Sequence, residues 1–170
     1  MHNTTEDRKK IFLLLIAILV PSFILDQVTK YLAEHYLADS PKVLIDGVFE
    51  FNLYHNSGAV WGSFSGNAII LAGVSILLVF FVLLYLFRIK YTKRNLPLLL
   101  CLIFIVCGAF GNLADRLKNK QVTDFIYFKL INFPIFNVAD IYVTCSTIIL
   151  AILILFYYKE EDFEWMKKEQ

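Results

Sequence analysis

The fold class is decided by one stretch, LPLLLCLIFIVCGAFGNLADRL, which runs from Leu96 to Leu117. It contains no charged residue before Asp115, and about 20 apolar residues suffice for a helix to cross the hydrocarbon core of a membrane. Its last turns carry Asn112, Asp115 and Arg116, which a plain membrane anchor would not need. Ionisable groups at this depth cost free energy and indicate a functional site. We therefore expect a transmembrane helix with a polar site at its end.

Three other segments have a similar length and composition, so that apolar segments occupy residues 11–31, 68–87, 96–117 and 138–158. Hydrophobic residues make up 58% of the chain, whereas soluble domains contain about 45–50%. We predict an all-α membrane protein with four transmembrane helices. The 170 residues predict a single integral-membrane domain, 1–170, and are too few for an internally duplicated transporter.

Clusters of basic residues predict the orientation of these helices. They precede the first segment, separate the second from the third, and follow the fourth. The clustered residues are Arg8, Lys9, Lys10, Arg88, Lys90, Lys93, Arg94, Lys159, Lys167 and Lys168. Because basic loops stay on the cytoplasmic side, both termini are expected in the cytoplasm, with loops 32–67 and 118–137 on the outer face.

The first segment also has features of a secretory signal peptide, with a basic start and an apolar run over residues 11–25. No small-residue cleavage site follows that run. The helical pattern continues into Asp26 and Lys30, an i, i+4 pair on one helix face. Pro21 is expected to bend this helix without ending it. These features favour a retained transmembrane helix.

The first outer loop contains VFEFNLY (Val48 to Tyr54), in which apolar and polar residues alternate. Such alternation predicts a half-exposed strand, and we expect a small sheet on the outer surface. The following NSGAVWG (Asn56 to Gly62) offers Asn and Gly for a tight backbone and Trp61 for the membrane interface.

On the third helix, Gly108, Asn112 and Arg116 recur at i, i+4 and i+8 and share one stripe. Gly108 allows close approach of another backbone or of a ligand. Asn112 offers amide donors and an acceptor, and Arg116 offers a charged fork for a carboxylate or carbonyl oxygen. The alternative is a small-residue helix contact with an arginine that reaches toward the interface.

Two carboxylates complete the candidate site. Asp124 lies in the second outer loop, and Asp140 begins the fourth helix. If they lie within a few ångströms of each other, they share one proton, and the pair can activate a water molecule against a peptide carbonyl. The alternatives are a solvated loop carboxylate at Asp124 and a helix N-terminal acid at Asp140.

Other chemistries lack their motifs. The serines of GSFSG (62–66) are displaced from the GxSxG pattern, no histidine follows them, and no GxGD occurs. The histidines, His2, His35 and His55, form no HExxH pair. The cysteines, Cys101, Cys107 and Cys145, lie in apolar segments without the spacing of a metal site or a disulfide framework, and we expect them to pack. With 16 basic and 15 acidic residues, nucleic-acid binding is not indicated, and no metal or cofactor is expected.

Five motifs appear in the order typical of signal peptidase II, the bacterial prolipoprotein signal peptidase family. They are DQVTK (Asp26 to Lys30), NSGAVWG (Asn56 to Gly62), CGAFGNLADR (Cys107 to Arg116), VTDF (Val122 to Phe125) and FPIFNVAD (Phe133 to Asp140). The chain therefore resembles this family over nearly its whole length.

The resemblance implies an aspartyl endopeptidase of the bacterial cytoplasmic (inner) membrane, with its active site toward the outer face. It would cleave diacylglyceryl-modified prolipoproteins before the lipidated cysteine, contact membrane lipid, and be inhibited by globomycin. A small extracytoplasmic β-cradle would accompany the four helices, and Asp124 and Asp140 would be the catalytic pair. Together with Gly108 of the stripe, the substrate site would comprise Asn56, Gly58, Asn112, Arg116, Asn137 and Ala139. The structural support would come from Asp26, Lys30 and Asp115.

Three residues depart from the family pattern: Cys107 replaces a common glycine, Thr123 a common valine and Ile141 a frequent serine. These departures bear on local packing and on substrate or inhibitor preference, since none removes a proposed catalytic group. A small proton or cation channel with intramembrane acids is the alternative function. A purely structural subunit would leave the polar motifs unexplained.

Overall fold

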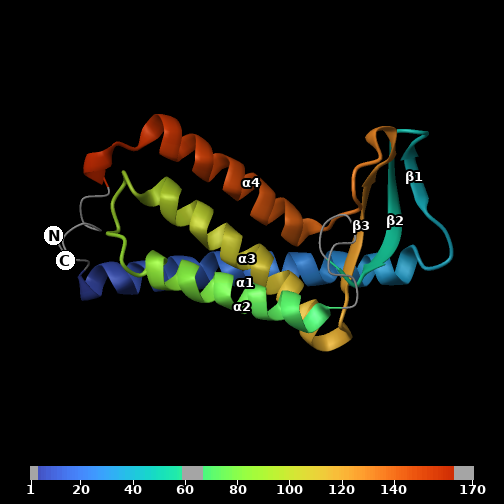
Figure 1. Ribbon diagram of the computed structural model, residues 1–170, viewed down its shortest axis with the longest axis horizontal. Helices are drawn as coiled ribbons and strands as arrows, with labels where there is room; N and C mark the ends of the chain where they lie inside the picture. Colours follow the sequence, from blue (N-terminus) through green and yellow to red (C-terminus); the bar gives the residue numbers. More distant parts are fainter. Residues whose placement is uncertain (1–3, 59–66, 163–170) are drawn as a thin grey trace.

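Four long helices run side by side, and a three-stranded sheet stands at one end of them (Figure 1). The structure is a computed structural model that describes residues 4–58 and 67–162. Its elements are α1 (Thr5–Tyr36), β1 (Lys42–Ile45), β2 (Phe49–Asn56), α2 (Ala68–Leu86), α3 (Leu96–Asn119), β3 (Val122–Phe128), the 3-10 turn η2 (Lys129–Ile131), α4 (Val138–Ile152) and the π-helical turn η3 (Leu153–Tyr157). The predicted class, a four-helix membrane protein with a small sheet, is confirmed.

All four helices are long and apolar enough to cross a membrane, the last one through η3 to Tyr157. The third is the central helix, because 72% of its most apolar window is buried, against 22% for α1 and 11% for each of the other two. Large apolar side chains on α2, such as Ile69 and Phe81, point outward. This distribution suits a bundle surrounded by lipid, in which only α3 is enclosed by protein.

Local sequence explains where the helices begin and end. Thr4 caps α1 and forms a reciprocal capping box with Asp7, and the helix continues through Pro21 as predicted. α3 ends at Asn119, and its C-cap residue Lys120 adopts a left-handed conformation with φ of 59°. Asn137 caps α4 and forms a second capping box with Asp140. The start of α4 is therefore fixed by a candidate catalytic residue.

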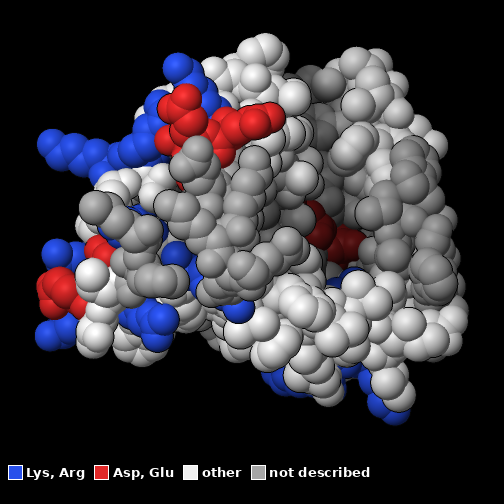
Figure 2. Space-filling view, turned by 60° about the vertical axis from the view of Figure 1, so that its left-hand side comes forward, with Lys and Arg blue, Asp and Glu red and all other residues white. Residues whose placement is uncertain are grey.

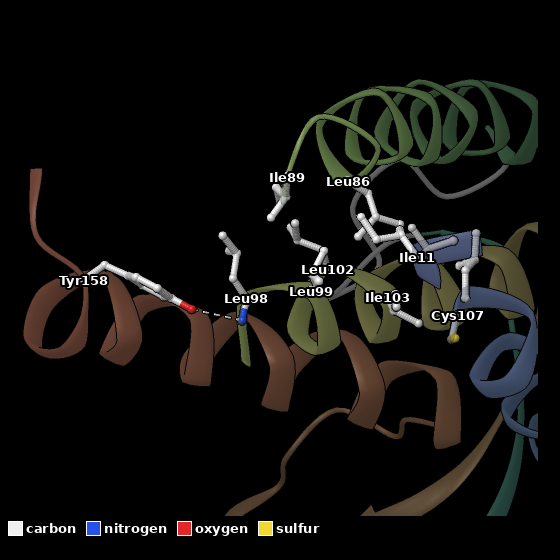
Figure 3. Close-up of a cluster of buried hydrophobic side chains, with 11 residues drawn as sticks. Ile11, Leu86, Ile89, Leu98, Leu99, Leu102, Ile103, Cys107 and Tyr158 are labelled. Carbon is white, nitrogen blue, oxygen red and sulfur yellow. Dashed lines mark hydrogen bonds between the residues drawn. The ribbon is translucent and has the colours of Figure 1, made fainter. Parts of the chain in front are cut away.

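The larger apolar core lies toward the end of the bundle that carries both termini (Figure 3). Its buried side chains come from α1, α2, α3 and the segments beside them; they include Ile11, Leu86, Ile89, Leu99, Ile103 and Cys107. The hydroxyl of Tyr158 accepts a hydrogen bond from the backbone N–H of Leu98 at 3.2 Å and donates one to the Arg94 carbonyl at 3.0 Å. A donor at the start of α3 is thereby satisfied inside an apolar region.

The cysteines follow the packing prediction in two of three positions. Cys101 and Cys107 are buried and free, whereas Cys145 is free and exposed on α4. A thiol behaves as a small apolar group, so exposure of Cys145 on a lipid-facing helix is compatible with a membrane.

Gly108 serves a helix contact. A Cβ atom placed there would overlap the carbonyl oxygen of Ala139 and lie 2.6 Å from Cγ2 of Val143. Of the two partners that the sequence left open, the backbone of α4 is the one present in this structure. The predicted substrate contact at Gly108 stays a prediction. Glycine is needed here for the close approach of α3 and α4.

The sheet is antiparallel, in the order β1, β2, β3. β2 confirms the strand predicted over residues 48–54, but β1 and β3 were missed, and Asp124 lies on β3 and not in a loop. The first five residues of β3, from Val122 to Ile126, are all buried, so its two faces show no alternation of polar and apolar residues. A second apolar cluster, around Ala33 and Phe125, packs this sheet against the C-terminal end of α1. The predicted position of Trp61 and the stretch 62–66 lie outside the described residues.

Gly108→Ala is expected to lower the free energy of unfolding by about 1–3 kcal/mol, because the added methyl group overpacks the contact between α3 and α4. Gly73→Ala on α2 is the matched control, since no atom lies within 4 Å of its added Cβ. That control should be neutral or slightly stabilising. Unfolding of the purified variants in detergent, followed by circular dichroism, measures both. Equal stabilities would contradict the close contact.

Candidate active site

The two predicted acids meet where the sheet joins the helices. Asp124 lies on β3 and is 2% exposed, and Asp140 occupies the first turn of α4. The side-chain Nδ2 of Asn137 donates to Oδ1 of Asp124 at 2.6 Å, and the backbone N–H of the same residue donates to Oδ2 of Asp140 at 3.1 Å. A single residue therefore contacts both carboxyl groups, and the predicted proximity is confirmed.

Two further amides complete the contacts of the acids. Nδ2 of Asn112 donates to Oδ1 of Asp140 at 2.7 Å, and Nδ2 of Asn56 donates to Oδ2 of Asp124 at 3.0 Å. All four carboxyl oxygens consequently accept an N–H hydrogen bond. Fixed donors of this kind hold both acids in one orientation.

A buried ion cluster lies directly behind these amides. The Lys30 ammonium is 2.9 Å from Oδ2 of Asp26 and 2.7 Å from Oδ2 of Asp115, and it donates to Oδ1 of Asn112 at 3.0 Å. Gln27 joins the two acids of this cluster, since its Nε2 donates to both at 3.1 Å. The cluster ties α1 to α3 through Asp26, Lys30 and Asp115.

This cluster decides which way the amides point. Because Oδ1 of Asn112 accepts from Lys30 and from Nδ2 of Asn137, its own Nδ2 is left to face Asp140. Oδ1 of Asn137 accepts the backbone N–H of Asp140, so its Nδ2 must turn toward Asp124. A charge on α1 thus orients the donors that hold both acids.

The pKa of the Asp124 carboxyl is raised from its ordinary value of 3.8 to about 7. Burial is the larger cause, and the negative charge of Asp140 is the second; the hydrogen bonds from Asn56 and Asn137 act in the opposite direction. An acid with this pKa holds a proton at a pH where an exposed aspartate would have lost it. The described residues hold no group of three His, Cys, Asp or Glu side chains placed to bind a metal ion.

A family model described as signal peptidase (SPase) II matches residues 16–156. The chain belongs to the signal peptidase II family. Similar relatives include the lipoprotein signal peptidase of Clostridium tetani, which is 38% identical over 153 residues that cover 88% of this chain and 95% of that protein. The lipoprotein signal peptidase of Clostridium novyi is also 38% identical, over 82% of this chain and 96% of that protein.

Two solved structures agree with the family assignment. Both are described as bacterial membrane enzymes determined by the in meso method, and each is 31% identical to this chain. One gives a TM-score of 0.75 and covers 92% of both chains; the other gives 0.73 and covers 85% of this chain and 94% of its own. The family resemblance inferred from the five motifs is thereby confirmed.

The remaining signal peptidase motif residues have distinct positions. The backbone N–H of Gly58 donates to Oδ1 of Asn56 at 2.9 Å and so orients the amide that contacts Asp124. Arg116 is partly exposed, and its Nη1 makes a long hydrogen bond of 3.5 Å to the Asn112 carbonyl. Its guanidinium is therefore only weakly held by its own helix.

Asn137 and Ala139 were predicted to line the substrate site, but both are fully buried. The N–H of Ala139 donates to Oδ1 of Asp26 at 3.0 Å, and its carbonyl packs against Gly108. The backbone of Ala139 thus contacts α1 and α3 in this structure, and its predicted substrate contact stays a prediction. Asn137 instead contacts the acids directly.

Sequence reasoning missed Gln27 and Glu34. Gln27 lies inside the DQVTK motif between Asp26 and Lys30, and that position was the available signal. Glu34 lies one turn after Lys30 on α1, outside every motif, and accepts hydrogen bonds from the sheet. No pattern in the sequence distinguishes it from a solvent-exposed helical glutamate.

Lys30→Met is expected to destabilise the protein by about 3–5 kcal/mol, because it leaves two buried carboxylates without their cation. It should also abolish peptidase activity, since Asn112 loses the contact that orients its amide. Lys10→Met is the control, because Lys10 pairs with Glu6 on an exposed surface and contributes little. Thermal unfolding in detergent and processing assays measure both effects; a stable, active Lys30→Met protein would contradict the assigned role.

Proposed function

We propose that Asp124 and Asp140 are the catalytic pair with which this member of the signal peptidase II family removes signal peptides from prolipoproteins. The observation that carries the proposal is the contact of Asn137 with both carboxyl groups. A shared set of donors keeps the acids close, and two close carboxyl groups retain one proton between them. That charge state is the one that aspartic peptidases use.

The reaction follows from this charge state. We assign the shared proton to Asp124, whose pKa is about 7, and the negative charge to Asp140. The ionised acid takes a proton from a water molecule, and the water oxygen forms a bond to the scissile carbonyl carbon. The protonated acid gives its proton to the carbonyl oxygen. When this tetrahedral adduct collapses, Asp124 takes back the proton from the adduct's hydroxyl group, the C–N bond breaks, and Asp140 gives its proton to the leaving amine. No covalent enzyme intermediate forms.

The amides have a separate role in this proposal. Asn56, Asn112 and Asn137 hold the acids through N–H groups that need not reorganise during the reaction. Arg116, beside them and only weakly held, is the side chain that we assign to a carbonyl oxygen of the substrate backbone. Gly58 contributes through Asn56, whose amide it orients.

The substrate that we propose is a prolipoprotein whose cysteine carries diacylglycerol, cleaved just before that cysteine. The acids lie at the membrane edge of the helices, where an apolar signal helix and two acyl chains can remain in lipid while water reaches the scissile bond. The apolar outer surface of α2 and α4 supports this arrangement. We propose inhibition by globomycin on the basis of the family.

We further propose that the protein lies in the bacterial cytoplasmic membrane with both termini inside and the site toward the outer face. The two termini and the connection between α2 and α3 lie at the same end of the bundle (Figure 1). Lys and Arg side chains gather at that end (Figure 2). The sheet and the two acids lie at the other end. This arrangement satisfies the positive-inside rule.

Asp124→Asn and Asp140→Asn should each abolish cleavage of a diacylglyceryl precursor peptide, by more than about a hundredfold, while the fold is retained. Asp46→Asn, at an exposed acid in the turn after β1, is the matched control and should leave activity unchanged. Mass spectrometry of the products locates the cut. Normal cleavage by either site variant would refute the pair. The channel alternative would require a proton or cation leak in liposomes that Asp140→Asn removes, without peptide cleavage.

The rate of cleavage should fall as pH rises through about 7, approaching tenfold per pH unit, because Asp124 loses the proton that the carbonyl oxygen needs.

The stability of the protein should change over a different pH range. Since burial raises the pKa of Asp124, its contribution to stability is present below about pH 4 and is lost as pH rises toward 7. Cleavage rates and unfolding midpoints measured between about pH 4 and 9 distinguish the two pH dependences. An unchanged rate across that range would contradict the assignment of the proton.

A further inference from the structure

Glu34, in the last turn of α1, holds two strands of the sheet through one oxygen atom. Its Oε1 lies 2.8 Å from Nε2 of His55 on β2 and accepts a hydrogen bond of 2.7 Å from Oγ1 of Thr123 on β3. His55 and Thr123 face each other directly in the antiparallel ladder. One carboxylate on a helix therefore clamps a cross-strand pair.

This clamp lies next to the proposed catalytic acid. Thr123 precedes Asp124 on β3, and successive residues of a strand point to opposite faces. Thr123 thus contacts α1 on one face while Asp124 contacts Asn56 and Asn137 on the other. Any rotation or sliding of β3 at Thr123 would displace the Asp124 carboxyl.

The ladder alone holds this part of the sheet weakly. Its register shifts between Phe51 and Tyr54, and after that irregularity only three residue pairs continue to the end of β2. One of these pairs is Tyr54 with Asp124, and another is His55 with Thr123. A clamp at the second pair compensates for the interruption of the ladder beside the acid.

We propose that Glu34 is a positioning residue for the peptidase reaction: through Thr123 and His55 it fixes the register of β2 and β3 and so places Asp124 against Asn56. This inference rests on the proposed catalytic role of Asp124.

The exposure of Glu34, His55 and Thr123 indicates that their contacts position Asp124 and add little to the overall stability. The Thr123 residue is 4% exposed, so its hydroxyl needs a partner, which Glu34 supplies. The side chains of Glu34 and His55 are 41% and 42% exposed, and a polar contact so open to water contributes little to stability. A small displacement of a catalytic group nevertheless has a large effect on rate.

The test measures kcat, KM and the unfolding midpoint of Glu34→Ala and Thr123→Val with a diacylglyceryl precursor peptide. We expect each to lower kcat about tenfold with KM nearly unchanged, since the position of Asp124 is affected. Thr123→Val leaves no buried hydroxyl without a partner, so its midpoint should be nearly unchanged, whereas Glu34→Ala should lower the midpoint modestly. The double variant should lose no more than Glu34→Ala alone, because that substitution already removes the contact with Thr123. Glu34→Gln and Thr123→Ser keep an acceptor and a hydroxyl, respectively, and should restore most of kcat.

Lys129→Gln is the matched control, because it removes another contact of the same sheet, the 3.0 Å pair with Glu50, away from the acids. Its kcat should equal that of the unaltered protein. Unchanged kcat in Glu34→Ala and Thr123→Val, or losses that follow the unfolding midpoint and are not restored by Gln and Ser, would overturn the inference. Asp124→Asn is included in the same assay: if it still cleaves, the proposed function fails, and if it is inactive while the clamp variants are normal, only this inference fails.

Discussion

The buried Lys30 ammonium is the contact on which the rest of the site depends. It neutralises two carboxylates on different helices, and it also sets the amide orientation of Asn112. Three charges inside an apolar bundle are stable only when they are paired and hydrogen-bonded, and here Gln27 supplies further donors to both acids. The free energy of burying these charges is therefore offset by a network that also arranges the reacting groups.

The same network connects the helices to the chemistry. Asp26 accepts the backbone N–H of Ala139, so the ion cluster on α1 reaches the first turn of α4. Gly108 permits the close packing of α3 and α4 that brings this turn within range. Asp140 then forms part of the capping box that starts α4. The same contacts among three helices therefore determine both the helix packing and the geometry of the acids.

The helices were predictable because membrane length and composition leave few alternatives, and the place of Asp140 at a helix start followed from the same segments. The strand that carries Asp124 was not predictable by alternation, since both of its faces are buried. The roles of Asn137 and Gly108 were also beyond the sequence alone. Amide orientation depends on partners distant in the chain, and a helical glycine can face either a backbone or a ligand. The motifs identified which residues belong to the site, whereas the contacts of each residue became known only from the structure.

The enclosure of α3 by protein has a consequence for how homologous chains diverge. Lipid tails accept almost any apolar side chain, whereas neighbouring helices accept only shapes that fit. Substitutions among Leu, Ile, Val and Phe should thus accumulate freely on the outward faces of α2 and α4 and rarely along α3. The rate at which each helix changes in evolution therefore depends on whether its side chains contact lipid acyl chains or other helices.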